Sequence, residues 1–408
     1  MQGEFAPHRI DSGHYRDSQM IELIAMPSSV PGETSTMRSD ACPILLVVDE
    51  LRQILGGGER IVLQLASSLT RYGYQPGILT FSLDPESAAL RVPPCPIYLL
   101  PLQRPFDIKA VRAALEFRAF LRQQKIRIVH TFFATSDIWA GFITKITSNA
   151  NLIWSRRDMG FLRTRKQRIA YRLMARFPDR VLAVSERVRL HAIDVDGVNP
   201  ERVETIYNGV NLEDWPSPSR PQRKPGEFLI VTVGNIRRVK GQDLFVRAAA
   251  TVVRQFPETR FLIVGEVLEK EYVNELRRLV DELGLTKYLR FEAGQTDLRQ
   301  HLTEADIFVL PSRSEGFSNA IIEAMASSLP VVATDVGGNS EAVADGASGF
   351  IAPPNDAEAL ADAVISLLSD PARARAMGLS GRKTVEEKFS MEIMVKQVAR
   401  AYTRLLHD

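Results

Sequence analysis

The chain has 408 residues, more than the roughly 250–300 residues at which a single hydrophobic core stops growing, so we expect two domains. Hydrophobic residues make up 45% and charged residues 25%, as in globular proteins, and no apolar run approaches the ~20 residues of a membrane-spanning helix. A net charge of +2 excludes the strong positive field that attracts nucleic acid, and two cysteines exclude a disulfide scaffold. We therefore expect a cytoplasmic protein without a nucleic-acid partner.

The beginning of the chain is polar and has no hydrophobic pattern. Residues 1–42 lack the basic segment followed by an apolar segment that marks a signal peptide. Their composition predicts a disordered leader. Order is expected to start with the apolar run at 43–49.

Short apolar runs without alternation recur through residues 43–212, and such runs are typical of buried strands in parallel sheets. They lie at 43–49, 77–81, 97–100, 126–131, 152–155, 181–185 and 203–207. Helical patterns separate them, for example at 108–124 and 168–176, and glycines 56–58 follow the first run. Strands that alternate with helices predict a first Rossmann-like domain.

Residues 213–390 repeat this organisation after a proline-rich linker at 216–226. Strand-like runs lie at 228–233, 260–264, 289–291, 307–310 and 331–333, and helical patterns at 241–255, 270–283, 319–328, 357–368 and 371–388. A last helix within 391–408 is expected to pack back onto the first domain. The predicted fold class is α/β, with two Rossmann-like, doubly wound parallel-sheet domains that face a cleft. Ligands of such sheets bind at the carboxyl ends of the strands.

The most informative stretch follows the run at 307–310 and opens a helix. Glu315 stands in the loop, and Glu323 falls about one turn into the helix among apolar residues, where an unpaired acid costs free energy. Ribose hydroxyls are suitable partners, because a carboxylate accepts hydrogen bonds from two of them. Between the acids, the amides of 316–319 form a helix N-terminus, which binds anions such as phosphate. Together these groups describe a site for a nucleotide sugar.

The spacing Glu315-x7-Glu323 resembles the signature of family 4 glycosyltransferases, which are retaining enzymes with the GT-B fold. Other segments are similar to further motifs of that family. Residues 233–241 resemble its G-x-x-R-x-x-K-G segment, residues 329–338 its P-V-V-A-T-D-V-G-G run, and residues 57–60, 183–186 and 206–210 its shorter motifs. The similarity covers roughly residues 43 to 388. It implies that the first domain binds the acceptor and the second domain the donor.

The resemblance also implies roles for single residues. Glu315 would orient the donor sugar, Glu323 would hold the ribose, and Lys240 with Arg237 would neutralise the departing diphosphate. The expected catalytic residues are Glu315, Lys240, Arg237, Arg157 and His130. The expected donor-binding residues are Gly57, Gly58, Gly234, Arg238, Gly294, Gly316, Phe317, Ser318, Asn319 and Glu323.

The sequence departs from the family pattern at two places. Asn235 stands where many members have an arginine, so Arg237 is the natural substitute and Arg238 the second choice. Arg157 occupies the place where many members have a histidine near the donor sugar. His130 is a weaker candidate, since a satisfied structural histidine is the competing interpretation.

The implied function is transfer of a hexose-type sugar from a UDP- or GDP-sugar to a glycan or lipid-linked acceptor, in cell-surface polysaccharide biosynthesis. No cofactor and no metal ion are expected, because two basic side chains could replace a divalent cation. Asp194 and Asp196 mimic a metal-binding D-x-D pair, but Gly197 follows them and favours a helix end and turn. A non-catalytic nucleotide-sugar-binding or regulatory subunit of the same fold remains the alternative.

Basic residues crowd the stretch 156–180. Nine of them stand there against two acidic residues, which gives a local net charge of +7. Two interpretations remain open, a solvated basic face or a patch that meets anionic lipid or a lipid-diphosphate acceptor. The second predicts a peripheral protein on the inner face of the membrane.

Overall fold

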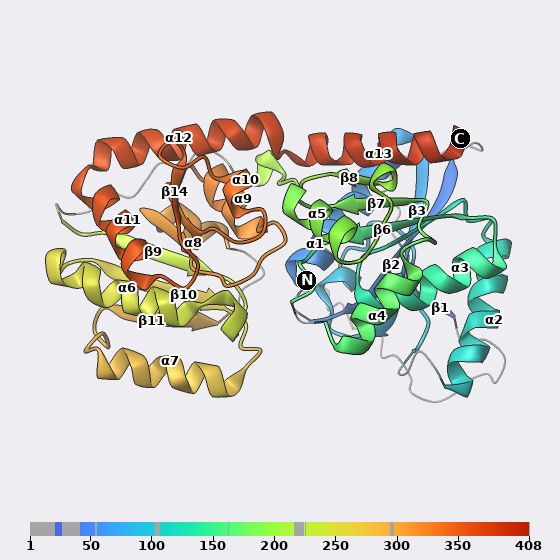
Figure 1. Cartoon of the computed structure of the whole chain (residues 1–408), viewed down its shortest axis with the longest axis horizontal. Coiled ribbons are helices and arrows are strands. Elements are labelled where there is room, and N and C mark those ends of the chain that lie inside the picture. The colour runs from blue at the N-terminus through green and yellow to red at the C-terminus, as the bar shows by residue number, and fades with distance from the viewer. Residues whose placement is uncertain are drawn as a thin grey trace, which may run out of the picture.

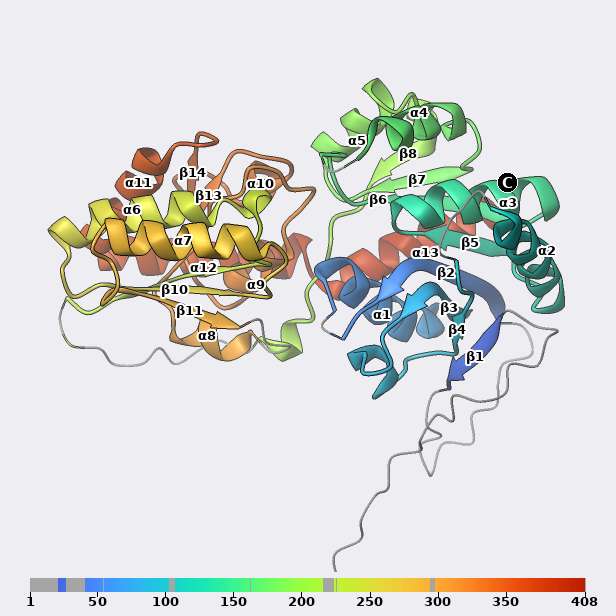
Figure 2. The same ribbon diagram turned by 90° about the horizontal axis from the view of Figure 1, so that it is seen from below.

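The computed structural model describes residues 21–26, 41–53, 55–102, 107–161, 163–215, 224, 226–293 and 298–407. These residues form two domains that lie side by side, each with a sheet between layers of helices (Figures 1 and 2). None of the helices in these ranges has both the length and the apolar character needed to cross a membrane.

The N-terminal sheet has eight strands within the described ranges, in the order β1-β4-β3-β2-β5-β6-β7-β8. They are β1 (Glu22–Ala25), β2 (Cys42–Leu51), β3 (Tyr74–Leu83), β4 (Ile97–Leu99), β5 (Ile128–Thr131), β6 (Asn151–Arg156), β7 (Arg180–Ala183) and β8 (Val203–Thr205). β1 pairs antiparallel with β4, and the other neighbours pair in parallel. In central strand β2, Leu46 and Val48 face one core while Leu45 and Val47 face the other. Burial of both faces explains why the run has no polar alternation.

Helices cover both faces of this sheet. One face packs against α1 (Gly57–Leu69) and the C-terminal helix α13 (Met391–His407). The other face packs against α2 (Ile108–Gln123), α4 (Arg165–Met174), α5 (Glu186–Asp194) and a π-helical segment at Ser136–Ala140 that continues into α3 (Gly141–Thr147). In Figure 1, α13 therefore runs along the side of the domain opposite to α2, α3 and α4.

The structure corrects part of the prediction for residues 1–42. Most of them lie outside the described ranges, but Glu22–Ala25 form β1 at the edge of the sheet, where Leu23 pairs with Tyr98. Cys42 already belongs to β2. The short β1 segment was missed because four residues between polar stretches show no period, and its partner strand lies far along the chain.

The C-terminal sheet has six strands within the described ranges, all parallel, in the order β11-β10-β9-β12-β13-β14. They are β9 (Leu229–Val233), β10 (Arg260–Gly265), β11 (Leu289–Ala293), β12 (Ile307–Leu310), β13 (Val331–Thr334) and β14 (Gly349–Ala352). The helices are α6 (Gln242–Gln255), α7 (Lys270–Glu282), α8 (Arg299–Glu304), α9 (Asn319–Ala326), α10 (Asn339–Ala342), α11 (Ala357–Ser369) and α12 (Pro371–Lys388). α6, α7 and α11 cover one face, and α9 with the end of α12 covers the other.

The chain crosses between the two domains twice. After β8 it enters the C-terminal domain, and between α12 and α13 it returns to the N-terminal domain (Figure 1). The two crossings lie side by side, because the amide of Val210 donates to the carbonyl of Phe389 and the amide of Met391 donates to the carbonyl of Val210, both at 2.9 Å. The domains are therefore joined by two adjacent segments.

Candidate active site

A cleft of about 370 Å³ lies between the two domains. The N-terminal domain lines it with Gly57, Gly58 and Arg60 at the start of α1, and with Arg157 after β6. The C-terminal domain lines it with residues of the segments 233–240 and 314–323, which follow β9 and β12. These loops stand at the carboxyl ends of parallel strands, where the topology predicts a ligand site.

Lys240 and Glu315 form an ion pair in this cleft. Nζ of Lys240 lies 2.6 Å from Oε1 of Glu315, and the hydroxyl of Ser312 donates a hydrogen bond of 2.6 Å to the same oxygen. Gly241 follows the lysine at a left-handed φ of +66°, and a Cβ there would lie 2.1 Å from the carbonyl oxygen of Pro311. Only glycine allows the lysine turn and the glutamate loop to approach this closely.

Glu323 lies in α9 and is nearly buried, with 8% of its surface exposed. Burial raises the pKa of Glu323, and Arg60 of α1 opposes this rise through a 3.2 Å ion pair between Nη1 and Oε1. Oε2 of Glu323 is buried and has no hydrogen-bond partner within the described ranges. An unpaired buried acceptor carries its full desolvation cost, so a hydroxyl donor that reached it would bind favourably.

A chain of amide hydrogen bonds links the two walls of the cleft. Arg157 donates to Oδ1 of Asn208 at 3.0 Å, Asn208 donates to Oδ1 of Asn319 at 2.7 Å, and Asn319 donates to the carbonyl of Gly57 at 3.1 Å. Burial lowers the pKa of Arg157 to about 10. The guanidinium therefore stays charged at neutral pH and adds a positive charge to the N-terminal wall.

The loop before α9 is pressed against the N-terminal domain. A Cβ at Gly316 would lie 2.0 Å from the carbonyl oxygen of Arg157, and the hydroxyl of Ser185 donates to the carbonyl of Gly316 at 2.9 Å. Nearby, the first two amides of α5 donate to the carboxylate of Glu341 at 2.7 and 3.0 Å. The amides of 316–319 are thus held between the two domains at the start of a helix.

Two family models match the chain in tandem. The model described as Glycosyltransferase Family 4 matches residues 55–214, and the model described as Glycosyl transferases group 1 matches residues 214–384. Together they span both walls of the cleft. The chain belongs to family 4 of the glycosyltransferases.

Curated relatives match this glycosyltransferase over part of their length. D-inositol 3-phosphate glycosyltransferase 2 of Catenulispora acidiphila is 33% identical over 246 residues, which cover 56% of this chain and 57% of the relative. The lipopolysaccharide core biosynthesis mannosyltransferase LpcC of Rhizobium leguminosarum is 33% identical over 186 residues, which cover 45% of this chain and 53% of the relative. The chain thus spans about half the length of the curated relatives it matches.

Solved structures establish the fold of the glycosyltransferase. Anabaena Alr3699/HepE, solved in complex with UDP and glucose, matches with a TM-score of 0.78 at 19% identity, and the match covers 89% of this chain and 100% of that chain. This likeness, together with the two facing Rossmann-like domains, confirms the predicted GT-B fold.

Most of the predicted site residues of the glycosyltransferase line the cleft. They are Glu315, Lys240, Arg237, Arg157, Gly57, Gly58, Gly234, Gly316, Phe317, Ser318, Asn319 and Glu323. Nε of Arg237 is buried and has no hydrogen-bond partner in the part of the chain that the structure describes. Gly294 lies outside the described residues.

Two predicted site residues, His130 and Arg238, are not among the described residues that line the cleft. His130 is 1% exposed at the end of β5, where its Nδ1 shares a 2.7 Å hydrogen bond with the hydroxyl of Tyr402, and burial lowers its pKa to about 3. Its ring faces α13 instead of the cleft, with its centre 5.8 Å from the ring centre of Tyr402. Arg238 does not line the cleft, because its exposed guanidinium pairs with Glu275 of α7 at 2.5 Å.

Sequence reasoning assigned no role to two residues of the site, Arg60 and Asn208. Arg60 supplies the ion-pair partner of Glu323, and Asn208 carries the hydrogen bonds between the walls. Both stand inside segments that resemble family motifs, 57–60 and 206–210. The residues that they contact lie more than 50 residues away in sequence, so local patterns do not reveal these contacts. The resemblance of the two segments to family motifs could have indicated that both residues belong to the site.

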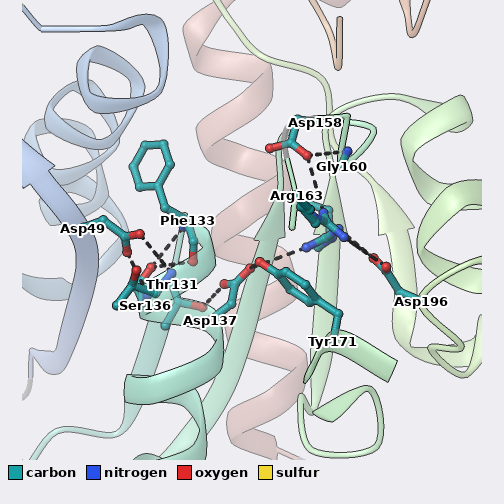
Figure 3. Close-up of polar contacts among 12 residues, drawn as sticks. Asp49, Thr131, Phe133, Ser136, Asp137, Asp158, Gly160, Arg163, Tyr171 and Asp196 are labelled. Atoms are coloured by element: carbon teal, nitrogen blue, oxygen red, sulfur yellow. Dashed lines mark hydrogen bonds and ion pairs between the residues drawn. The ribbon is translucent and has the colours of Figure 1, made fainter. Parts of the chain in front are cut away.

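In the structure, the basic residues of 156–180 fall into a group that is paired inside the domain and a group that is exposed. Arg156 is buried and Arg163 is partly buried, and they pair with Asp196 at 2.6 and 3.0 Å. Their guanidinium groups lie 4.3 and 4.1 Å from the ring centre of Tyr171; Figure 3 shows Arg163 with Tyr171 and Asp196. Asp196, the second acid of the D-x-D-like pair, therefore uses its carboxylate in arginine pairs. Five basic residues after Arg163 remain exposed: Arg165, Lys166, Arg168, Arg172 and Arg176.

Proposed function

We propose that this glycosyltransferase moves a hexose-type sugar from a UDP- or GDP-sugar to a glycan or lipid-linked acceptor, with retention of anomeric configuration, in cell-surface polysaccharide biosynthesis. The observation that carries the proposal is the convergence of Lys240, Glu315 and Glu323 on one interdomain cleft. The match to LpcC, which is named for lipopolysaccharide core biosynthesis, supports the cell-surface role. The likeness to HepE, solved with UDP and glucose, supports a nucleotide-sugar donor.

The donor is proposed to lie along the C-terminal wall. The unpaired Oε2 of Glu323 accepts a ribose hydroxyl, and the amides of 316–319 receive the diphosphate at the positive end of α9. Lys240 and Arg237 stand on the same wall and attract the same anion. Glu315, held by Lys240, faces the hydroxyls of the sugar.

The proposed transfer exchanges one bond at the anomeric carbon for another. The bond to the diphosphate oxygen breaks, the electron pair stays on that oxygen, and the acceptor oxygen bonds to the anomeric carbon. The acceptor proton passes to the departing diphosphate. Oε1 of Glu315 already accepts hydrogen bonds from Lys240 and Ser312, which lowers its nucleophilicity, so we favour attack on the same face over a covalent intermediate.

We propose that Lys240 and Arg237 stabilise the leaving diphosphate without a divalent cation. Preorganised cations in a water-poor cleft lower the barrier where charge develops. Turnover in the presence of excess EDTA is expected to equal turnover without it. Loss of turnover in EDTA, restored by added Mg²⁺ or Mn²⁺, would show that the two side chains are not sufficient.

The test of the main proposal is turnover of a panel of UDP- and GDP-sugars, followed by proton NMR of the product. An α-configured donor is expected to give an α-linked product, and a β linkage would refute retention. The alternative, a non-catalytic nucleotide-sugar-binding or regulatory subunit, predicts binding of a donor without transfer or hydrolysis. Release of free nucleotide from the donor therefore separates the two.

We further propose that the N-terminal domain works against the anionic inner face of a membrane. α4 exposes the apolar residues Ile169 and Leu173 among its four basic residues, Arg165, Lys166, Arg168 and Arg172. α2, on the same face of the sheet, exposes Ile108, Val111 and Leu115 at helical spacing. Apolar side chains among basic ones fit a bilayer interface, where each basic residue contributes about 1 kcal/mol with anionic lipid.

Co-sedimentation with phosphatidylglycerol–phosphatidylcholine vesicles tests this surface. Vesicle binding is expected to weaken as salt is added, and to fall by about tenfold or more in the variant Arg165→Glu/Arg168→Glu. Arg277→Glu/Arg278→Glu, two exposed arginines of α7 in the other domain, is the matched control. Absent binding, or equal loss in both variants, would remove the membrane from the proposal.

A further inference from the structure

The rim of the cleft on the N-terminal side carries an exposed aromatic ring. Phe161 lies in the loop of residues 157–161 after β6, lines the cleft and is 67% exposed. Asp158 of the same loop also lines the cleft, with 70% of its side chain exposed. Phe133 lines the cleft as well, but its ring packs beside Gly58. Phe161 therefore offers an aromatic face that the protein itself leaves largely uncovered.

The loop that carries Phe161 is held by its own hydrogen bonds. Gly160 adopts a left-handed φ of +67°, its amide donates to Oδ1 of Asp158 at 2.6 Å, and its carbonyl accepts the amide of Arg163 at 3.1 Å. The guanidinium of Arg163 reaches back to Asp158 at 3.4 Å (Figure 3). These contacts fix the position of the loop on the rim of the cleft.

A buried ion-pair network anchors this loop to the domain. Asp196 pairs with both Arg156 and Arg163, and Asp137 accepts a 2.8 Å hydrogen bond from the hydroxyl of Tyr171 and lies 3.6 Å from Arg156 (Figure 3). Burying such charges costs several kcal/mol per ion, so the arrangement requires close pairing. Through Arg163, this network ties the loop to the interior of the domain.

We propose that Phe161 and Asp158 form the acceptor platform of the enzyme. The ring of Phe161 stacks on the apolar C–H face of a neutral pyranose, and the carboxylate of Asp158 accepts hydrogen bonds from its hydroxyls. This inference rests on the proposed function, because that function places the donor along the C-terminal wall and leaves the rim around Phe161 to the acceptor. It adds the residues and the chemical class of the acceptor group that they bind.

The chemistry of the two side chains favours a sugar ring over other ligands. An aromatic face and a few placed polar groups are what a small-molecule pocket uses to bind and to orient its ligand. A carboxylate repels phosphate but forms strong hydrogen bonds with hydroxyls. A neutral sugar combines a flat apolar face with adjacent hydroxyls, so it satisfies both side chains together.

The test is glycoside binding to the full chain in the presence of UDP. Methyl α-D-glucopyranoside, methyl α-D-mannopyranoside and methyl β-D-galactopyranoside serve as probes, measured by saturation-transfer NMR. Phe161→Ala is expected to weaken the best-bound glycoside about tenfold, and Phe161→Trp, which keeps an aromatic face, to change it less than about twofold. Leu173→Ala removes an equally exposed apolar side chain of α4 outside the cleft and serves as the control.

Several results would overturn the acceptor platform. In the first, the wild-type chain binds none of the three glycosides. In the second, Phe161→Ala binds the glycosides as well as the wild type does. In the third, Phe161→Ala loses affinity for UDP or for anionic vesicles instead of for the glycosides. A loss of UDP affinity would assign the ring of Phe161 to the nucleotide, and a loss of vesicle affinity would assign it to a membrane. If the proposed function were wrong, the wild-type chain would bind neither UDP nor GDP. The glycoside titrations of Phe161→Ala test the acceptor platform separately.

Discussion

Gly316→Ala tests whether the two walls of the cleft must meet. An ideal Cβ at residue 316 lies 2.0 Å from the carbonyl oxygen of Arg157, whereas ordinary contact begins at 3.4 Å. Both nearest atoms belong to the backbone of Arg157, so no side-chain rotation relieves the overlap, and one wall must move by the difference of 1.4 Å. A misplacement of about 1 Å costs roughly 100-fold in rate. We therefore expect kcat/KM to fall about 100-fold.

The assay is donor turnover, with thermal unfolding measured in parallel. The unfolding measurement shows whether a loss of kcat/KM comes with a loss of stability, because the neighbouring Phe317 packs in a hydrophobic cluster that spans both domains. Gly381→Ala of α12 is the control, since a Cβ there meets nothing closer than the side chain of Met325 at 3.4 Å. If Gly316→Ala kept kcat/KM within about threefold of wild type, the close approach of Arg157 would be dispensable and the reasoning would fail.

Three further substitutions probe the charges of the protein. Lys240→Ala is expected to lower kcat about 100- to 1,000-fold without unfolding the chain, because the departing diphosphate loses a fixed cation; near-normal kcat would show that the donor lies elsewhere. Arg60→Ala removes the cation that opposes the raised pKa of Glu323, so the acidic limb of the kcat/KM profile should move to higher pH, and an unmoved limb would contradict this. Burial raises the pKa of Asp137 from 3.8 to about 7, so the folded state binds this proton more tightly and the unfolding free energy should fall as pH rises between these values. Asp137→Asn should remove that part of the slope in urea unfolding, and an unchanged slope would show that Arg156 keeps the carboxyl ionised.

The alternation of strands and helices was predictable because burial leaves a direct trace in the sequence. Runs such as Ile44–Val48 are apolar at every position, since each strand packs on both faces. The strands β1 and β14 left no comparable trace. β1 begins with the charged Glu22 and β14 with Gly349, so neither is a continuous apolar run and their pairing depends on the neighbouring strand more than on their own composition.

Placement of the site was predictable where a local motif determines it and unpredictable where distant segments do. Glu315 and Glu323 belong to one strand-loop-helix unit, so their spacing alone locates them. His130 stands near the end of a strand, but its side chain hydrogen-bonds with Tyr402 of α13, a contact that no local pattern reveals. Arg237 and Arg238 are neighbours in sequence, and the turn that they enter decides which one reaches the cleft.

The return of α13 to the N-terminal domain has a consequence for synthesis on the ribosome. Residues of Met391–His407 complete the core beneath α1, so that core stays open until α13 has emerged. During this time the apolar surface under Tyr402 is exposed to solvent, and such surface promotes aggregation of nascent chains. A fragment that lacks α13 would leave the same apolar surface uncovered permanently.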